Sequence, residues 1–527
     1  HLGTASLGAA LGGELGIAGS IGVSLAHNVL NNNTIARVEK AEIQVNNLQI
    51  EAENKSQIHA HSWAAAAALS GGGEAGVGAA GAGAHARNSI NNHTKAYIVD
   101  NSTVEQADEI SVKAHNKADI EAKTWSWAVG LGAGGEAGGG AAVGVAKAEN
   151  LIGQSGSSQV LAYVRDSTLK AKEQVSVTTT NKATIHSHVS SGSVALGGGA
   201  LLGGAISASA TEAKNLIATD VLAYSKQATI KESTHQSQDQ ELKIGIKSTD
   251  NSDIKAHTQA ISIADSIGLV GGSVSIGMAL AQNVIENNVH AFLDSAQKIT
   301  GHSLDIEAQE NATLESSSLI VSSAASASLG FAIAGAGGKT KVDVNTSTQA
   351  YIQNSQEIKL SGDVKVNADN SLDVQAEVNG QAEALSLLGA AGEGSVVDID
   401  LAPVTKAYLD NSTVSAHEVN IKADQTQAKA VATSKGFSVG TEASVGVAKA
   451  EVHKTNASEV LARAGKDINI QSKLLSVQAL GQSTLHAKSV AGSGSLAYSG
   501  AGAVAKTGEQ TGVQAVIGKD AQVNVQS

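Results

Sequence analysis

The side chains best suited to chemistry in this sequence are histidines spaced two residues apart. His59 and His61 form one such pair, and His186 and His188 form another. Residues i and i+2 lie on the same face of a β-strand, so each pair could chelate a metal ion. Zinc sites take three or four protein ligands, and the spacing supplies no third one. We therefore expect a polar outer face, with metal binding as the alternative.

Acidic residues offer a second kind of candidate site. Asp100-Asn101, Asp410-Asn411 and the pair Asp398/Asp400 could bind calcium weakly at corners of the chain. The sequence contains neither an EF-hand loop nor the Gly-Gly-x-Gly-x-Asp repeat that binds calcium in β-helices. The prediction is therefore a set of hydrogen-bonded turns and no cofactor, with calcium as the alternative.

No motif indicates catalysis. The stretch Gly130-Leu-Gly-Ala-Gly-Gly135 has the spacing of a dinucleotide-binding loop, but such spacings arise by chance among 57 glycines. That loop also requires a following helix and a downstream acid within a βαβ unit, which the sequence does not indicate. Thr178-Thr179-Thr180 is isolated and does not form the regular threonine face of an ice-binding protein. We expect that the protein is not an enzyme.

These residues are embedded in an unusual composition. Hydrophobic residues make up 42% of the 527 residues, yet aromatic residues make up only 2%, and there is one Pro and no Cys. The lack of Cys excludes a disulfide framework and Cys-rich zinc modules. A net charge of −13 argues against nucleic acid as a partner. No apolar run is long and uninterrupted enough to predict membrane insertion.

A repeat organises the whole chain. An Ala that is followed in most copies, two residues later, by an aliphatic residue recurs nine times, about every 60 residues. Two near-identical segments support this alignment: Asp100–Val104 recurs as Asp410–Val414, and Val143–Glu149 recurs as Val445–Glu451. We expect residues 1–527 to form one continuous array, excerpted from a larger protein. The repeat anchors are Ala36, Ala96, Ala162, Ala223, Ala291, Ala350, Ala407, Ala462 and Ala515.

The elements that position the candidate residues are predicted to be strands. Ile110, Val112 and Ala114 alternate with polar residues, which is the period of a strand with one buried face. An Asn follows this stretch in most repeats and is suited to a tight corner. The predicted corner residues are Asn54, Asn116, Asn181, Asn251, Asn311 and Asn370. Short strands, corners and a long repeat predict an all-β, parallel, right-handed β-solenoid.

Two geometries satisfy this repeat. Each unit could make three coils of about 20 residues, which the regular asparagines favour, or one wide, flattened coil, which the Gly/Ala-rich segments favour. In either case half of the aromatic residues align at one repeat position and should stack as a ladder that stabilises the coils. A carbohydrate-binding stripe is the alternative interpretation. The predicted ladder is Tyr97, Tyr163, Tyr224, Phe292, Tyr351 and Tyr408.

The repeat resembles a known family of secreted bacterial proteins. Ala96-Tyr-Ile-x-Asp-Asn-Ser-Thr-Val104, the alternating stretch after it and the Gly/Ala-rich run resemble the repeat regions of filamentous-haemagglutinin-like adhesins and leukotoxin-type repeat proteins. The resemblance implies an extracellular or cell-surface solenoid exported by a type V route. It implies a structural rod or filament used in adhesion or cell contact, with self-association and an unidentified cell-surface ligand. A toxin repeat region or a carbohydrate-binding or carbohydrate-processing β-helix are the alternatives.

Overall fold

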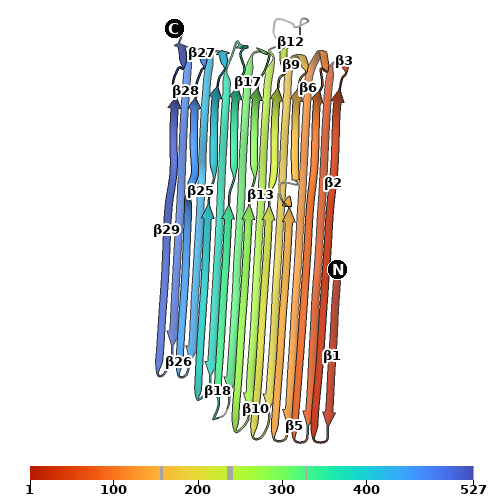
Figure 1. Ribbon diagram of the computed structural model, residues 1–527, viewed down its shortest axis with the longest axis vertical. Helices are drawn as coiled ribbons and strands as arrows, with labels where there is room; N and C mark the ends of the chain where they lie inside the picture. Colours follow the sequence, from red (N-terminus) through yellow and green to blue (C-terminus); the bar gives the residue numbers. More distant parts are fainter. Residues whose placement is uncertain (155–157, 234–240, 328, 526–527) are drawn as a thin grey trace.

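The computed structural model describes residues 1–154, 158–233, 241–327 and 329–525. The chain is 87% β-strand. Its described part contains no helix, and so none that could cross a membrane. All strand pairs are parallel, as a solenoid requires, and they form one 16-stranded and one 14-stranded sheet. The protein is therefore a parallel β-solenoid (Figure 1).

The 16-stranded sheet, here called sheet A, contains one long strand per coil and a set of short strands. Its long strands are β1 (Leu2–Gly12), β4 (Asn47–Gly72), β6 (Thr103–Gly134), β9 (Thr168–Gly198), β13 (Lys243–Ile267), β17 (Ser303–Ser326), β21 (Val364–Leu385), β25 (Glu418–Gly440) and β28 (Leu474–Gly494). Its short strands are β3 (Glu42–Gln44), β12 (Thr229–Glu232), β16 (Lys298–Gly301), β20 (Ile358–Leu360), β24 (Thr413–Ser415), β27 (Asn469–Ser472) and β30 (Gln522–Val525).

The 14-stranded sheet, sheet B, carries the chain back in the opposite direction. Each of its long strands follows a long strand of sheet A after a short turn, here called the tip turn. The strands that begin at the tip turns are β2 (Leu15–Glu39), β5 (Ala75–Val99), β7 (Ala137–Ile152), β10 (Leu202–Ile217), β14 (Val270–Ile285), β18 (Phe331–Val344), β22 (Leu388–Leu401), β26 (Ala443–Ala464) and β29 (Tyr498–Ile517). Their continuations in the middle coils are β8 (Ser158–Arg165), β11 (Thr219–Lys226), β15 (Asn288–Asp294), β19 (Ser347–Gln353) and β23 (Val404–Asp410).

One repeat makes one coil. Ala36 pairs with Ala96, Ala96 with Ala162, and the same register continues through every anchor to the pairing of Ala462 with Ala515. The wide, flattened coil is therefore confirmed, and the alternative geometry of three narrow coils per repeat is wrong. Strand β4 alone runs for 26 residues in unbroken register with β6, which no 20-residue coil can accommodate.

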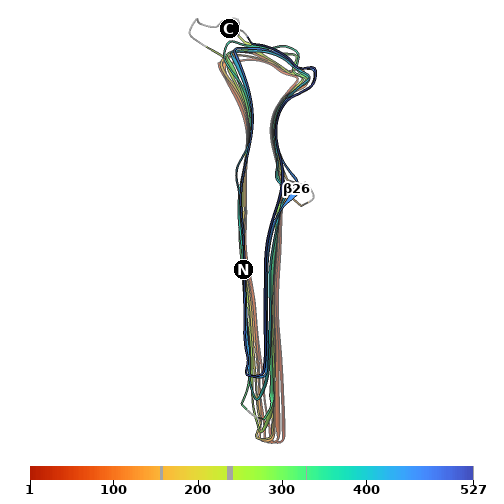
Figure 2. The same ribbon diagram turned by 90° about the vertical axis from the view of Figure 1, so that its left-hand side faces the viewer.

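The coil has a wide end and a narrow end. Figure 2 shows two walls that lie close together at the bottom and splay at the top, where a short third side closes the coil. We call the narrow part the blade: residues 124–146 in the coil of β6 and β7, and the paired residues of the other coils. The remainder is the head. The head core contains branched residues such as Ile110, Val164 and Leu169, whereas a separate cluster in the blade consists of alanine alone.

Inward-facing glycines allow the two sheets of the blade to approach each other. A Cβ atom added to Gly130 would lie 1.9 Å from the carbonyl oxygen of Ala141 on the facing sheet. One added to Gly138 would lie 1.9 Å from the carbonyl oxygen of Gly198. Such contacts are far inside van der Waals distance, so no side chain fits there. The glycines of the Gly130–Gly135 stretch therefore pack two sheets together and line the tip turn.

The predicted asparagine corners are wrong. Asn54, Asn116, Asn181, Asn251, Asn311 and Asn370 all lie inside the long strands of sheet A. The corners lie at the head, where sheet B meets the short strands, and each has a residue with positive φ. These residues are Lys40, Asn101, Asp166, Gln227, Ser295, Asn354, Asn411, Asp467 and Asp520. Asn is suited to both places, since it tolerates the left-handed region and also forms amide ladders within sheets.

Candidate functional site

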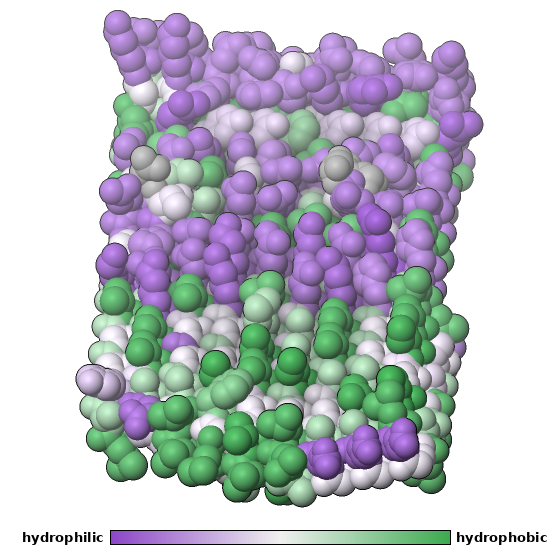
Figure 3. All heavy atoms as spheres, turned by 60° about the horizontal axis from the view of Figure 1, so that its bottom comes forward, coloured by the Kyte–Doolittle hydropathy of each residue, from purple (hydrophilic) through white to green (hydrophobic). Residues whose placement is uncertain are grey.

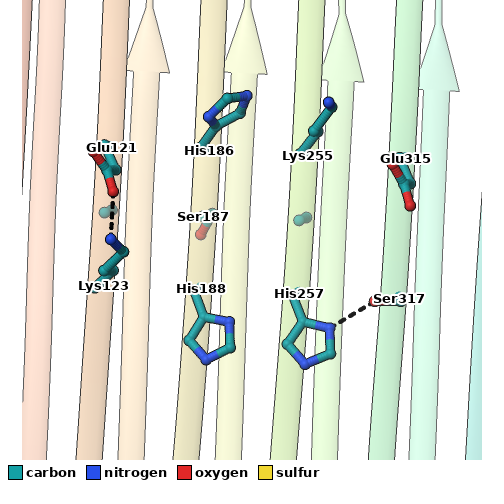
Figure 4. Close-up of a pocket in the computed structure, with 11 residues that line it drawn as sticks. Glu121, Lys123, His186, Ser187, His188, Lys255, His257, Glu315 and Ser317 are labelled. Atoms are coloured by element: carbon teal, nitrogen blue, oxygen red, sulfur yellow. Dashed lines mark hydrogen bonds and ion pairs between the residues drawn. The ribbon is translucent and has the colours of Figure 1, made fainter.

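A shallow polar hollow on the outer face of sheet A contains one of the predicted histidine pairs. Strands β6, β9, β13 and β17 position its side chains, because alternate residues of a strand face outward. The inward residues between them, Ala122 and Ala256 among them, are buried. The hollow has a volume of about 290 Å³. Its outward lining is Glu121, Lys123, His186, His188, Lys255, His257, Glu315 and Ser317 (Figure 4).

Imidazoles form the centre of this hollow. The rings of His188 and His257 stack with centroids 4.9 Å apart, and His257 Nδ1 lies 2.7 Å from the hydroxyl oxygen of Ser317. His186 Nε2 is 3.6 Å from a carboxylate oxygen of Asp253. Burial lowers the pKa of His188, and the neighbouring His257 and Lys123 lower it further. Burial also lowers the pKa of His257. Both stacked rings are therefore neutral at neutral pH.

The two predicted histidine pairs do not converge on one metal. His59 is in register with Glu121 on the next strand, and Glu121 is in register with His186 on the strand after that. The pairs are thus two strand spacings apart, or about 10 Å. His59 instead contacts Glu121, with Nδ1 3.0 Å from a carboxylate oxygen. The pattern of His-x-His correctly placed each pair on one outer face, but sequence spacing could not show that His257 is the ring beside His188.

A different group supplies metal-type ligands among the described residues. Ligand atoms of Asp398, Glu451 and His453 lie within 4.8 Å of one another on sheet B. Asp400, the other residue of the predicted calcium pair, is not in this group. Lysines already neutralise Glu451, since Lys449 Nζ is 2.6 Å and Lys506 Nζ 3.3 Å from its carboxylate oxygens. A cation would have to displace these lysines, so the geometry favours a surface ion-pair network.

The other predicted calcium sites are corners, as their structural interpretation predicted. Asp100 and Asn101 have φ of 60°, and Asn411 has φ of 43°. The side-chain amide of Asn411 donates to Asn354 Oδ1 of the neighbouring coil at 2.9 Å. Asp410 pairs with Arg463 of the next coil. These groups therefore connect one coil to the next.

The predicted aromatic ladder stacks on the outer face of the head. Successive rings lie with centroids 4.7–4.9 Å apart and planes within 12° of parallel. Arg463 follows Tyr408 in the register and lies over its ring, 5.5 Å from the centroid. Burial raises the pKa of Tyr224 to about 12, so its hydroxyl stays protonated. Each ring face is covered by the next ring, which leaves little aromatic surface for a sugar to stack on.

Buried polar ladders cross the interior and were not predicted. Asn28, Asn88, Asn150, Asn215 and Asn283 are in register on sheet B, and each amide donates to the next at 2.7–2.8 Å. On sheet A, Asn116 donates to Asn181 at 2.8 Å, and Asn181 donates to Asp250 at 2.5 Å. The sequence did contain a signal for these ladders, because an Asn recurs at the same inward-facing strand position in successive repeats.

Two buried carboxyl groups extend the sheet A ladder. Asp250 and Glu310 are paired in register and have no exposed surface. The amide of Asn287 donates to Asp250 Oδ2 at 2.9 Å and to Glu310 Oε1 at 3.2 Å. Burial raises the pKa of Asp250 to about 6, and burial with the neighbouring Asp250 raises that of Glu310 well above its usual range. The pair therefore retains a proton near neutral pH.

Comparison with protein-family models, curated proteins and solved structures found no match.

Proposed function

We propose that this chain is a structural segment of an extracellular bacterial repeat protein that acts in adhesion or cell contact. The observation that carries the proposal is the unbroken register of the nine anchors from Ala36 to Ala515. A solenoid of this kind needs only contacts between neighbouring coils, so it can extend without a new core. The lack of cysteine supports export by a type V route, because no disulfide can form before the chain reaches the outside.

The shape of the coil refines this role. Each coil advances the solenoid by only about 4.8 Å, the spacing between strands. The 26 residues of β4 extend about 86 Å across the solenoid axis. Each coil is thus far wider than the length that it adds along the solenoid axis. The segment is better described as a stiff, flat ribbon than as a narrow rod, and its broad faces are what it presents to a partner.

Electron microscopy and cell binding together test this proposal. We expect uniform flat particles about 86 Å across, and binding of protein-coated beads to host or neighbouring bacterial cells. Loss of binding when the beads are coated with heat-unfolded chain is the control. Particles of irregular shape, or folded chain on beads that bind no cell surface, would contradict the proposal. Lysis of host cells by the purified chain would instead favour a toxin repeat region.

A second candidate function is glycan binding on the outer face of sheet A, where the blade begins. The three tryptophans of the chain all lie there, on the adjacent strands β4 and β6. Trp63 and Trp127 are 43% and 44% exposed. Trp125 lies beside His188 at a ring distance of 6.3 Å, at the margin of the imidazole hollow. Exposed indoles next to hydrogen-bonding side chains are suited to sugar rings, since they combine an apolar face with polar contacts.

Tryptophan fluorescence reports on this face alone. We expect neutral maltohexaose to change the emission more than a heparin hexasaccharide does, because Lys123 and Lys255 are balanced by Glu121 and Glu315 and the stacked histidines are neutral. Trp125→Ala should remove the response, whereas Tyr351→Phe in the ladder should retain it. An unchanged spectrum with both heparin and neutral maltohexaose would exclude this second function and leave the structural one intact.

A further inference from the structure

The outer blade face of sheet B is apolar over all nine coils. We call it the blade face; it comprises the outward residues of the sheet B strands between the tip turn and the row of Lys147. Every one is Gly, Ala, Val, Leu, Ile, Met, Phe or Tyr, and Tyr498 alone has a polar side-chain atom. Ile21 is 77%, Ile206 58% and Val445 53% exposed. Figure 3 shows the apolar end of the molecule below a hydrophilic band.

The blade face is bounded by polar rows, and it differs from the outer face of sheet A on the other side of the blade. Charged and polar residues begin in the next two outward rows, which contain Lys147, Glu149 and Lys449. The outer blade face of sheet A, on the other side of the blade, includes Asp265, Glu383 and Lys435. The sheet A side also has exposed apolar residues, among them Leu69, Trp127 and Phe437, but charged residues interrupt it, whereas no charged residue interrupts the blade face.

Several glycines on the blade face make room for no other group of the chain. A Cβ atom added to Gly81, Gly83, Gly335, Gly337 or Gly394 would meet nothing within 4 Å. The inward glycines of the same strands are different, since the facing sheet leaves them no room. Glycine weakens a strand, and in a strand interior it often marks the close approach of another backbone. The outward glycines thus indicate a second sheet outside the chain.

Branched residues and glycines alternate across the face. Strand β2 contributes Leu15, Ile17, Ile21 and Val23, while its neighbour β5 contributes small residues at most of the paired positions. Strand β14 contributes Ile276 and Met278, which are in register with Gly335 and Gly337 of β18. The face is therefore a series of ridges and furrows, as two interdigitating sheets require.

We propose that the blade face binds the blade face of a second copy of this chain, in a two-fold symmetric pair. The face measures about 30 Å along the strands and about 38 Å across nine of them, or about 1,100 Å² for each copy. A stable protein interface needs about 800 Å² from each partner. A two-fold axis that lies in the plane of the interface brings the same surface of two copies face to face, so ridges of one copy can enter furrows of the other.

A lipid bilayer fits the face less well. Inserting the blade would place Asp265, Glu383 and Lys435 of sheet A in hydrocarbon, each at a cost of about 2.5 kcal/mol or more. It would also expose the unpaired edges of the outermost strands, such as β29, to lipid. A second copy covers sheet B alone and leaves sheet A in water. This inference concerns lateral pairing and goes beyond the proposed role in adhesion.

The test is the mass of the 527-residue chain in solution. Light scattering after gel filtration should give twice the 52.8 kDa of one chain. The double variant Gly335→Val/Gly337→Val fills one furrow, and we expect it to raise the dissociation constant at least tenfold, or about 1.4 kcal/mol. Its melting temperature should be unchanged or higher, because valine favours a strand and has room there. The double variant should therefore associate more weakly while it remains folded.

Gly245→Val is the matched control. Gly245 faces outward from the head part of β13, and an added Cβ atom meets nothing within 4 Å there either. This variant should remain dimeric. Since the chain has no cysteine, Ala208→Cys should also give crosslinked dimers on oxidation, whereas Gly245→Cys should not.

Three outcomes would overturn the proposal. One is a monomer at every concentration up to about 100 µM. Another is a dimer that the furrow-filling variant leaves unchanged, since association would then occur through the strand edges. The third is a monomer that floats with vesicles of phosphatidylcholine and phosphatidylglycerol, since a bilayer would then be what covers the face.

Discussion

The head and the blade are built from the same backbone ladder but have opposite distributions of side chains. In the head the two sheets diverge, so branched residues such as Ile110 and Leu169 fill the interior and polar residues face water. In the blade the sheets converge, so the interior is mostly alanine, serine and glycine, and the large apolar residues of sheet B face outward. Sheet separation therefore determines where apolar bulk can be placed, and a thin blade can place it only outside.

The largest effect should come from forcing the blade open. Gly130→Val places a side chain where the carbonyl oxygen of Ala141 already lies, so we expect a loss of about 3 kcal/mol or more in the free energy of unfolding. Gly81→Val, on the outer side of the blade, is the control and should cost nothing. Denaturant unfolding followed by circular dichroism measures both. Equal losses for the two variants would show that the blade is not closely packed.

The head should respond to removal of bulk instead. Ile110→Ala leaves a cavity among branched residues, and we expect a loss of about 3 kcal/mol. Ala66→Gly in the blade removes one methyl group and should cost about 1 kcal/mol. The same unfolding measurement compares them. A blade variant that costs as much as the head variant would contradict the difference between the two cores.

The buried carboxyl pair makes the stability of the head sensitive to pH. The pKa of Asp250 is raised to about 6 and that of Glu310 is raised further, so the folded chain holds protons that the unfolded chain releases. The stability is therefore fully present below about pH 4 and is lost as the pH rises through 6 and above. We expect Glu310→Gln to raise the stability at pH 8 by roughly 2 kcal/mol and to flatten its pH dependence.

The control for this titration is Glu315→Gln on the same strand. Glu315 faces outward, so its replacement should leave the pH dependence as it is. Melting temperatures measured from pH 5 to pH 8 distinguish the variants. A profile of Glu310→Gln that parallels the unmodified chain would show that the pair does not hold the proton.

The smallest effect should come from the outside of the head. Tyr224→Ala removes a ring that stacks on Tyr163 and on Phe292 with centroids 4.8 Å away, and we expect a loss of about 1–2 kcal/mol. Tyr224→Phe retains both stacks and should be neutral, since Phe292 already occupies the column. Thermal unfolding checks both variants. A loss in the phenylalanine variant equal to that in the alanine variant would mean that the hydroxyl, not the stack, stabilises the ladder.

Prediction from sequence succeeded where one residue type repeats at one position. The anchors and the aromatic ladder were found this way, because parallel coils place equivalent residues directly beside each other. The asparagines show the limit of this approach. Asn116 recurs in register as Asn54, Asn181 and Asn370, whereas Asp250 and Glu310 take its place in two coils. Repetition alone does not distinguish a corner from an inward amide ladder. The corner residues vary from Lys40 to Asp520, so composition could not reveal them.

The candidate sites divide in the same way. The His-x-His pattern placed His186 and His188 on one face, because alternation along a strand is a local property. Their stacking partner His257 is 69 residues from His188, and this repeat is longer than the mean. The blade face was also not predicted, because its residues look like ordinary core alternation in any single strand. Only the pairing of the two sheets shows which half of that alternation faces outward.

The sequence by itself determined the strands, the repeat and the register, since these follow from alternation and recurrence along one chain. The tertiary structure decided the separation of the two sheets, and with it the division into head and blade. That separation depends on what faces each residue across the interior, as Gly130 faces Ala141. Sequence spacing does not encode such a contact, because it is set by how two distant walls pack together.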